Sequence, residues 1–230
     1  MTLPFTIEQF LDVFRRYNDG VWPLQWILNA LAMVAFVATM RRARWSSRAR
    51  SRLASGILAA LWLWVGIAYH VAFFRTINPA SWLFAIGFVG EGVLIAWLGL
   101  LRPRLQFELR SDAGSRIGAA LIAYALIAYP VIGYALGHRY PSAPTFGVPC
   151  PTTIFTFGML LLCPPPRPRA LFVIPAAWAL IASVAAIELG MWEDMGLVAA
   201  AITATFMALR QRTDDSRSAG QRHILKPVVQ

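Results

Sequence analysis

The sequence predicts an all-α protein, a polytopic membrane bundle of about seven transmembrane helices. Hydrophobic residues make up 58% of the 230 residues and charged residues 14%, whereas about a quarter of a soluble domain is charged. The apolar runs are long and uncharged, and clusters of arginine separate them. We expect a short amphipathic interfacial helix over residues 1–20, a transmembrane domain over 21–210 and a basic, disordered cytoplasmic tail over 211–230.

Each apolar run is a candidate span. The fifth and seventh are short for a hydrocarbon core of about 30 Å, so flanking residues extend them or neighbouring helices bury them. The predicted spans are Trp22–Met40, Leu53–Phe74, Ser81–Leu101, Ile117–Leu136, Pro149–Leu162, Leu171–Leu189 and Met195–Leu209.

The basic residues predict the orientation of the bundle. Only four of the 21 Lys and Arg residues fall on one side of the predicted membrane, namely Arg15, Arg16, Arg75 and Arg139. The positive-inside rule then places the N-terminus outside and the C-terminus in the cytoplasm. The basic side holds Arg41, Arg42, Arg44, Arg48, Arg50, Arg52, Arg102, Arg104, Arg110, Arg116, Arg167, Arg169, Arg210, Arg212, Arg217, Arg222 and Lys226.

The net charge of +10 is therefore a topology signal. It also predicts a lipid-bilayer partner, with anionic lipid at the cytoplasmic arginine clusters. No aromatic-interleaved basic domain accompanies the charge, so we expect no nucleic-acid partner.

The first helix opens with the capping box Thr6-Ile7-Glu8-Gln9. Its apolar residues then follow the spacing of one helical face, and Asn18-Asp19-Gly20 is expected to end it. A simple anchor on the outer membrane face and a lid over an outward-facing cavity both fit this helix. The apolar face consists of Ile7, Phe10, Leu11 and Phe14.

A thiol segment begins the fifth span, where Cys150 stands between two prolines. Pro151 suits the first helical position, so Cys150 is predicted to be the N-cap. At that position the helix dipole favours a thiolate, an anion or a soft metal ion. Thr152 and Thr153 add hydroxyls beside it. Cys163 lies about 20 Å further along the same helix, too far for a disulfide.

Further polar candidates fall near the same outer end: His70 ends the second span, His138 follows the fourth and Glu188 nearly ends the sixth. Together with Cys150 they form a candidate set for zinc, copper or mercury. Glu91 lies near the middle of the third span, where an acid is a functional candidate.

Structural alternatives stand beside each of these assignments. Cys150 is then a packed cap, His70 a hydrogen-bonded interfacial group and Glu91 a protonated, hydrogen-bonded acid. Asp194 suits the N-cap of the last helix, which explains it without any function. An organic or anionic ligand at the thiol segment is a further alternative to a metal.

Several segments together resemble an uncharacterised family of bacterial integral membrane proteins, classed only as a domain of unknown function. The resemblance implies a multi-pass protein of the bacterial inner (cytoplasmic) membrane and implies no activity. The matching pieces are Pro4-Phe5-Thr6, Glu8-Gln9-Phe10, Tyr17-Asn18, Val21-Trp22-Pro23, Tyr69-His70, Phe73-Phe74, Ile77-Asn78-Pro79-Ala80, Gly137-His138-Arg139-Tyr140-Pro141 and Phe146-Gly147-Val148-Pro149-Cys150-Pro151-Thr152-Thr153.

Three functions remain open from the sequence. The first is transport or sensing of a small solute or ion through an outward-facing polar pocket. The second is a non-catalytic accessory or assembly subunit, with a homo-oligomer or another membrane protein as its partner. The third is a metal-dependent or thiol-dependent membrane enzyme, although no HExxH, GxSxG or P-loop motif is present. The sequence leaves the cofactor, if the protein uses one, unknown.

Overall fold

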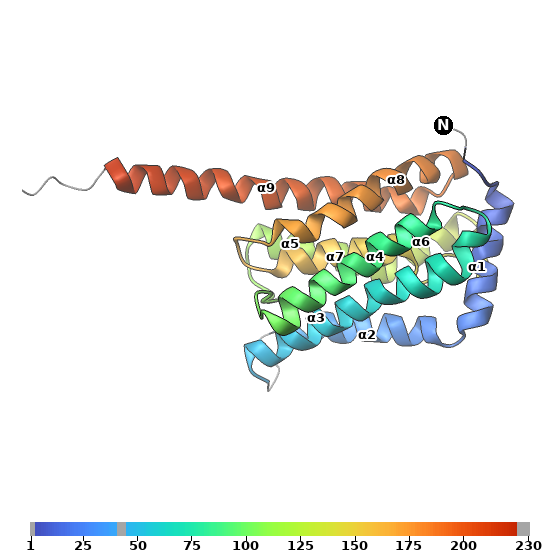
Figure 1. Cartoon of the computed structure of the whole chain (residues 1–230), viewed down its shortest axis with the longest axis horizontal. Helices are drawn as coiled ribbons and strands as arrows, with labels where there is room; N and C mark the ends of the chain where they lie inside the picture. Colours follow the sequence, from blue (N-terminus) through green and yellow to red (C-terminus); the bar gives the residue numbers. More distant parts are fainter. Residues whose placement is uncertain (1–2, 41–44, 225–230) are drawn as a thin grey trace, which may run out of the picture.

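The computed structural model describes residues 3–40 and 45–224, with residues 211–224 as backbone only, and in this part of the chain the regular elements are all helices. The prediction of an all-α bundle is confirmed (Figure 1). The α-helices are α1 (Ile7–Val21), α2 (Leu24–Ala38), α3 (Ser47–Trp64), α4 (Ser81–Ala96), α5 (Ala113–Ala123), α6 (Tyr129–Ala135), α7 (Pro149–Leu162), α8 (Val173–Leu189) and α9 (Met195–Ile224). Three π-helical segments and three 3-10 segments join or extend them: η1 (Val65–Phe73), η2 (Phe74–Thr76), η3 (Trp97–Leu101), η4 (Tyr124–Ala128), η5 (Arg169–Phe172) and η6 (Trp192–Asp194).

Five continuous helical rods are long and apolar enough to cross a membrane. If the bent pair α1 and α2, with 85° between the two helices, counts as one span, the number of candidate spans rises to six. Helix α7 is apolar but shorter. Every predicted span is thus helical, while the number and direction of the crossings stay predictions. The five rods are Ser47–Thr76, Ser81–Leu101, Ala113–Ala135, Arg169–Leu189 and Trp192–Arg210.

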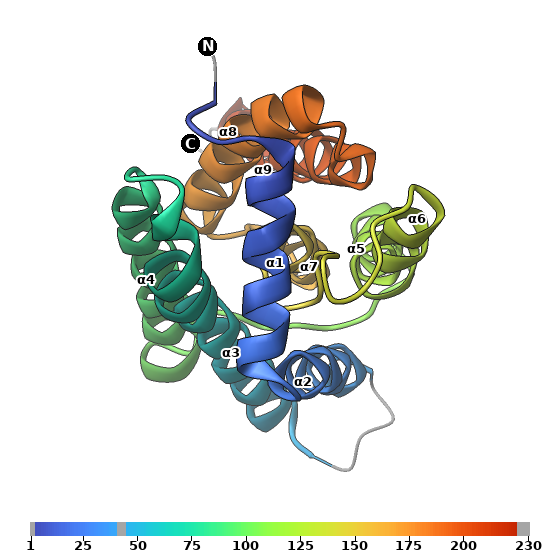
Figure 2. The same ribbon diagram turned by 90° about the vertical axis from the view of Figure 1, so that its right-hand side faces the viewer.

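Helix α7 is the central element of the bundle. All its residues except Cys150 are buried, and the other long helices surround it in the end-on view (Figure 2). Of the two predicted explanations for this short span, burial among neighbouring helices is therefore confirmed. At about 1.5 Å per residue the helix is roughly 21 Å long, and enclosure by protein removes any need for it to match the bilayer.

Glycines set the closest helix contacts. A Cβ on Gly118 of α5 would lie 2.6 Å from the carbonyl oxygen of Gly158 of α7, and the reverse distance is 2.7 Å. Gly92 of α4 is also tightly packed, because a Cβ there would lie 2.9 Å from Leu63 of α3. A Cβ added at Gly90 would have no atom of the described residues within 4 Å, so Gly90 packs against none of the described helices.

Helix α1 lies across one end of the bundle (Figures 1 and 2). The predicted capping box is confirmed: the Thr6 backbone N–H donates to Gln9 Oε1 at 2.9 Å, and the Gln9 N–H donates to Thr6 Oγ1 at 3.4 Å. The helix continues to Val21 instead of ending at residues 18–20. Asn18 does not break it, because this side chain points inward and makes its hydrogen bonds to the loop 137–148.

The two ends of the bundle differ in charge. The end with α1 also carries the turns 77–80 and 190–194 and the loop 137–148, and the described arginines of 48–52, 102–116 and 167–169 lie toward the other end (Figure 1). The predicted basic residues Arg41, Arg42, Arg44 and Lys226 fall outside the described residues.

The last helix is longer than its predicted span. Helix α9 continues beyond Leu209 to Ile224 and extends past the arginine-rich end of the bundle (Figure 1). The sequence predicts a disordered tail from residue 211. The difference has a physical reason, since extending an existing helix costs far less than nucleating one and no proline interrupts residues 211–224.

Candidate functional site under helix α1

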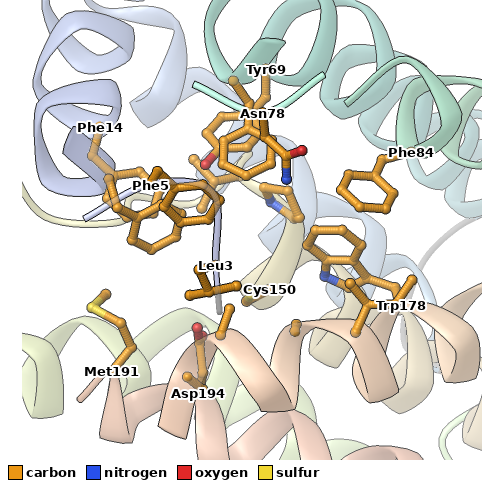
Figure 3. Close-up of a pocket in the computed structure, with 18 of the residues that line it drawn as sticks. Leu3, Phe5, Phe14, Tyr69, Asn78, Phe84, Cys150, Trp178, Met191 and Asp194 are labelled. Atoms are coloured by element: carbon orange, nitrogen blue, oxygen red, sulfur yellow. The ribbon is translucent and has the colours of Figure 1, made fainter. Parts of the chain in front are cut away.

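A cavity of about 70 Å³ lies beneath α1 and is called here the α1 pocket (Figure 3). Its walls are mainly aromatic, and its polar groups come from α7, η6, α6 and the η2–α4 turn. The lining residues are Leu3, Phe5, Phe10, Phe14, Tyr69, Phe74, Asn78, Phe84, Tyr129, Val148, Pro149, Cys150, Trp178, Ile181, Ala182, Ala185, Ala186, Met191 and Asp194.

Asp194 is the acidic group of the α1 pocket. Its side chain is buried, with 5% of the residue exposed, and in Figure 3 its carboxyl points into the cavity. The Tyr129 hydroxyl donates to Asp194 Oδ1 at 2.6 Å. The Cys150 thiol lies against the same carboxyl on one side and beside the Trp178 indole on the other. Three helical elements, α6, α7 and η6, thus meet at one carboxyl.

A second acid adjoins the first. Glu193 is fully buried, and its Oε1 lies 2.6 Å from His138 Nδ1. Its backbone carbonyl accepts a hydrogen bond from the Tyr124 hydroxyl at 2.7 Å, while its Oε2 has no hydrogen-bond partner among the described residues. Of these two buried carboxyls, Glu193 is paired with an imidazole, and no described ion pair joins Asp194 to an arginine or lysine.

A larger cavity of about 410 Å³ lies on the other side of Tyr129, between α2 and the α5–α6 rod. Tyr129 and the residues flanking Cys150 separate it from the α1 pocket, and His138 is its imidazole. It is lined by Gln25, Trp26, Asn29, Ala125, Leu126, Tyr129, Pro130, Gly133, Tyr134, His138, Tyr140, Ala143, Pro144, Thr145, Phe146 and Pro151.

Helix α1 fixes the loop that leads into α7. Asn18 Nδ2 donates to the backbone carbonyls of Pro141 at 2.6 Å and Ala143 at 2.8 Å, and Thr145 Oγ1 donates to Asn18 Oδ1 at 2.7 Å. The Tyr17 hydroxyl donates to the Gly147 carbonyl at 3.2 Å. Residues far apart in the sequence thereby hold the start of α7, and Cys150 with it, in place.

Two π-helical segments border the site. Tyr69 lies in η1, and η4 ends directly before Tyr129. A π-helical segment widens the helix by one residue per turn and re-aims the side chains that follow it, and such segments are frequent at functional sites. Both tyrosines that line the α1 pocket thus lie in, or directly after, a π-helical segment.

Cys150 lines the α1 pocket, but it is not the N-cap. Val148 occupies that position with an extended backbone, and Pro149 takes the first helical position in place of Pro151. The reason is that proline fits the first position, and here two prolines compete for it. Its polar neighbours include the Asp194 carboxyl and the Trp178 indole.

His70 lies behind the α1 pocket and does not line it. The ring is fully buried among aromatic side chains, with its centroid 4.8 Å from that of Phe88 and 5.3 Å from that of Trp178. Its Nδ1 lies 3.5 Å from Ser81 Oγ, and its Nε2 has no described hydrogen-bond partner. His70 packs against one wall of the pocket, the Trp178 indole.

The remaining predicted residues lie apart from both cavities. Thr152 and Thr153 are buried within α7, where Thr153 Oγ1 donates to the Pro149 carbonyl at 2.8 Å and Thr152 Oγ1 has no described partner. Glu188 is exposed beside the N-terminal segment, over a shallow hollow. Glu91 is buried in α4, with neither carboxyl oxygen paired among the described residues.

The predicted metal ligands are not brought together. Within residues 3–40 and 45–210, no group of three or more His, Cys, Asp or Glu side chains is arranged to hold a metal ion. Cys150 lines the α1 pocket and His138 lines the larger cavity. His70 lies in an aromatic cluster, and Glu188 lies at the surface. Only Cys150 of the four contacts the pocket carboxyl.

The sequence prediction missed Tyr129, Trp178 and Glu193, and it assigned Asp194 only a capping role. The available signal was the adjacent acid pair Glu193-Asp194 between two apolar spans, at their predicted outer end, where charged groups are costly. An N-cap explanation accounts for one of two adjacent acids and leaves the other without a reason.

Comparison with known proteins places the chain in a family without assigning it an activity. Neither the curated proteins nor the solved structures include a match to it. A family model described as "Family of unknown function (DUF6064)" matches residues 7–219. This span includes every residue of the α1 pocket except Leu3 and Phe5. The chain therefore belongs to the DUF6064 family of unknown function.

Proposed function

We propose that this protein binds a small solute or ion in the α1 pocket and acts in its transport or sensing at a bacterial inner membrane. The observation that carries the proposal is the buried Asp194 carboxyl, which faces a cavity and is held by Tyr129 and Cys150. Burying an acid without a basic partner is costly, so such a group in an apolar helix bundle indicates a functional site.

The position of the pocket supports this function. It lies at the end of the bundle that carries few arginines, the end that the positive-inside rule assigns to the outside. Phe5, Phe10 and Phe14 close it from the N-terminal segment and α1. We therefore favour the lid function of α1 over that of a simple anchor.

Protection of Cys150 from alkylation tests the proposal. The full chain carrying Cys163→Ala, purified in detergent, is treated with iodoacetamide, a small alkylating reagent that matches the cavity in size, alone or with solutes from four classes: organic cations, organic anions, neutral polar solutes and metal ions. We expect one class to slow alkylation of Cys150, because an occupied α1 pocket excludes the reagent. Alkylation that no class slows contradicts the proposal. Uptake of the protecting solute into proteoliposomes then distinguishes transport from sensing.

An accessory or assembly subunit is the second candidate. Its support is the extension of α9 beyond the bundle together with the open position at Gly90, which leaves room for a helix of another chain. Co-purification of a stoichiometric membrane partner from native membranes would favour it. Solute uptake by a monomer in proteoliposomes would count against it.

A further inference from the structure

The walls of the α1 pocket are unusually rich in aromatic rings for a cavity of about 70 Å³. Five phenylalanines, two tyrosines and one tryptophan line it, from the N-terminal segment, α1, η1, η2, α4, α6 and α8. In Figure 3 the rings of Phe5, Phe14 and Tyr69 lie across the cavity from the Asp194 carboxyl, and Trp178 closes a side. Aromatic rings thus surround a site with one acid.

We propose that the α1 pocket binds a small alkylammonium cation, with Asp194 as the counter-charge and the aromatic rings as its cage. This inference rests on the proposed solute-binding function and names the substrate class. Ring faces attract a cation within about 6 Å, and quaternary ammonium groups are typically bound in this way. A carboxylate adds the charge partner that a desolvated cation requires.

The charge balance of the site favours a cation. Asp194 and Glu193 provide two buried carboxyls, and His138, which is paired with Glu193, is the one base in contact with either in the described part of the chain. Tyr129 donates to one oxygen of Asp194 and, as a neutral group, brings no counter-charge to the carboxyl. A bound cation would supply the missing charge.

The wall chemistry distinguishes an organic cation from a metal ion. A hard cation such as Na⁺ or Ca²⁺ takes about six or more oxygen ligands, whereas this pocket offers mainly ring and alkyl carbon. A soft metal ion prefers several thiolate or imidazole ligands. The pocket holds one thiol, Cys150, and His70 lies behind Trp178.

The size of the cavity limits the ligand. A water molecule needs about 10–15 Å³ of such space, so about 70 Å³ holds roughly five non-hydrogen atoms. Tetramethylammonium has that size, and tert-butanol is a neutral molecule of similar size and shape. A longer amine would fit only with its chain directed out between α1 and the bundle.

The experiment compares these two probes in the Cys163→Ala protein, with the rate of Cys150 alkylation measured with and without each probe. We expect tetramethylammonium to slow alkylation and tert-butanol at equal concentration to leave it unchanged. Equal protection by both, or protection only by anions, neutral solutes or metal ions, overturns the cation assignment while the solute-binding function stands. If no class of solute protects Cys150, both the cation assignment and the solute-binding function are contradicted.

Variants identify the groups involved. Asp194→Asn should weaken tetramethylammonium protection by about 30-fold or more, as expected for removing one partner of a desolvated charge pair. Glu188→Gln, at an exposed acid of the same end, should leave it unchanged. Since Asp194→Asn also changes the surroundings of the thiol, the readout is the ratio of rates with and without probe within each variant.

A second variant keeps the test decisive if Asp194→Asn does not fold. Phe5→Leu removes one ring from the segment before α1 and leaves the bundle helices intact. We expect it to weaken protection by tetramethylammonium about two- to fivefold, the usual size of a single cation–π contact. Unchanged protection in this variant would contradict the aromatic cage.

Discussion

The hydroxyl of Tyr129 on α6 donates a hydrogen bond to Asp194 Oδ1, 2.6 Å away, across 65 residues of sequence. Both residues are buried, and both line the α1 pocket. The bond fixes the carboxyl at the turn between α8 and α9 relative to the start of α6. One contact therefore joins α6 to the acid pair at the wall of the α1 pocket.

Tyr129→Phe should destabilise the protein by about 1–3 kcal/mol, because the substitution leaves a buried acceptor on Asp194 without its donor. The measurement is the thermal unfolding midpoint of the detergent-purified chain. Tyr134→Phe is the matched control, since Tyr134 is 59% exposed on the same helix. Equal midpoints for the two variants would show that the Tyr129–Asp194 bond does not stabilise the fold.

Gly158→Ala should destabilise the bundle by about 1–3 kcal/mol, the usual cost of overpacking a tight core contact. A Cβ at this position would lie 2.7 Å from the Gly118 carbonyl oxygen and from Ile122 Cγ1. Gly90→Ala, with nothing within 4 Å, is the control and should be neutral or slightly stabilising, because alanine favours a helix over glycine. Thermal unfolding of both variants checks the pair. If Gly158→Ala is as stable as Gly90→Ala, α5 and α7 are not in direct contact.

Asn18→Ala should free the loop 137–148, since the side chain makes three hydrogen bonds to it. The measurement is limited trypsin digestion in detergent, and we expect cleavage after Arg139 to become several-fold faster. Asp19→Ala is the control, because Asp19 is exposed and its 3.9 Å ion pair with Arg15 contributes little. Cleavage at the same rate in the two variants would show that Asn18 does not hold the loop.

Asp112 caps α5 and gives a pH-dependent contribution to stability. Burial raises the pKa of this carboxyl, but the Ser115 N–H at 2.8 Å and the Arg110 guanidinium outweigh it and hold its pKa below the ordinary 3.8. The carboxylate therefore stabilises the fold above about pH 4, and this contribution is lost as the pH falls through the lowered pKa.

Asp112→Ala should accordingly cost about 1 kcal/mol at neutral pH, the typical cost of losing a cap. The difference in stability between Asp112→Ala and the natural sequence should shrink toward pH 3. Asp112→Asn keeps a capping oxygen and should therefore lower the stability by less at neutral pH. Thermal unfolding at several pH values provides the measurement. A deficit that is the same at pH 7 and pH 3 would argue against a charged cap.

The orientation of the bundle can be tested with two introduced cysteines in a chain carrying Cys150→Ala and Cys163→Ala. Ser142→Cys lies in the loop beside α1, and Gln106→Cys lies at the arginine-rich end. We expect a membrane-impermeant maleimide applied to intact cells to label position 142, because the positive-inside rule places that end outside. Labelling of position 106 alone would reverse the orientation.

Local patterns in the sequence were sufficient to predict the helices. Apolar runs of span length gave the all-α class, and the Thr6–Gln9 spacing gave the capping box, because both depend on residues within a few turns of one another. The bounds of α7 also followed from its apolar run, and the family resemblance was recognisable from several short segments taken together.

The site depended on contacts that no local pattern contains. Cys150 was a sequence candidate, and its partners Tyr129, Trp178 and Asp194 come from three other elements. His70 and Glu188, equally plausible from their positions near the outer end, instead reached an aromatic cluster and the surface. Hydropathy gives the depth of a residue along a span, whereas helix rotation and packing decide which side chains meet.

The sequence by itself determined that this chain forms apolar helices with a basic end and an amphipathic first helix. Composition, periodicity and capping act over short distances and do not need the fold. Only the tertiary structure decided that α7 is enclosed, that α1 covers a pocket and that Asp194 faces Cys150 and Tyr129. Those outcomes depend on the Gly118–Gly158 contact and on the hydrogen bonds of Asn18 and Tyr129, each of which joins residues at least 40 positions apart.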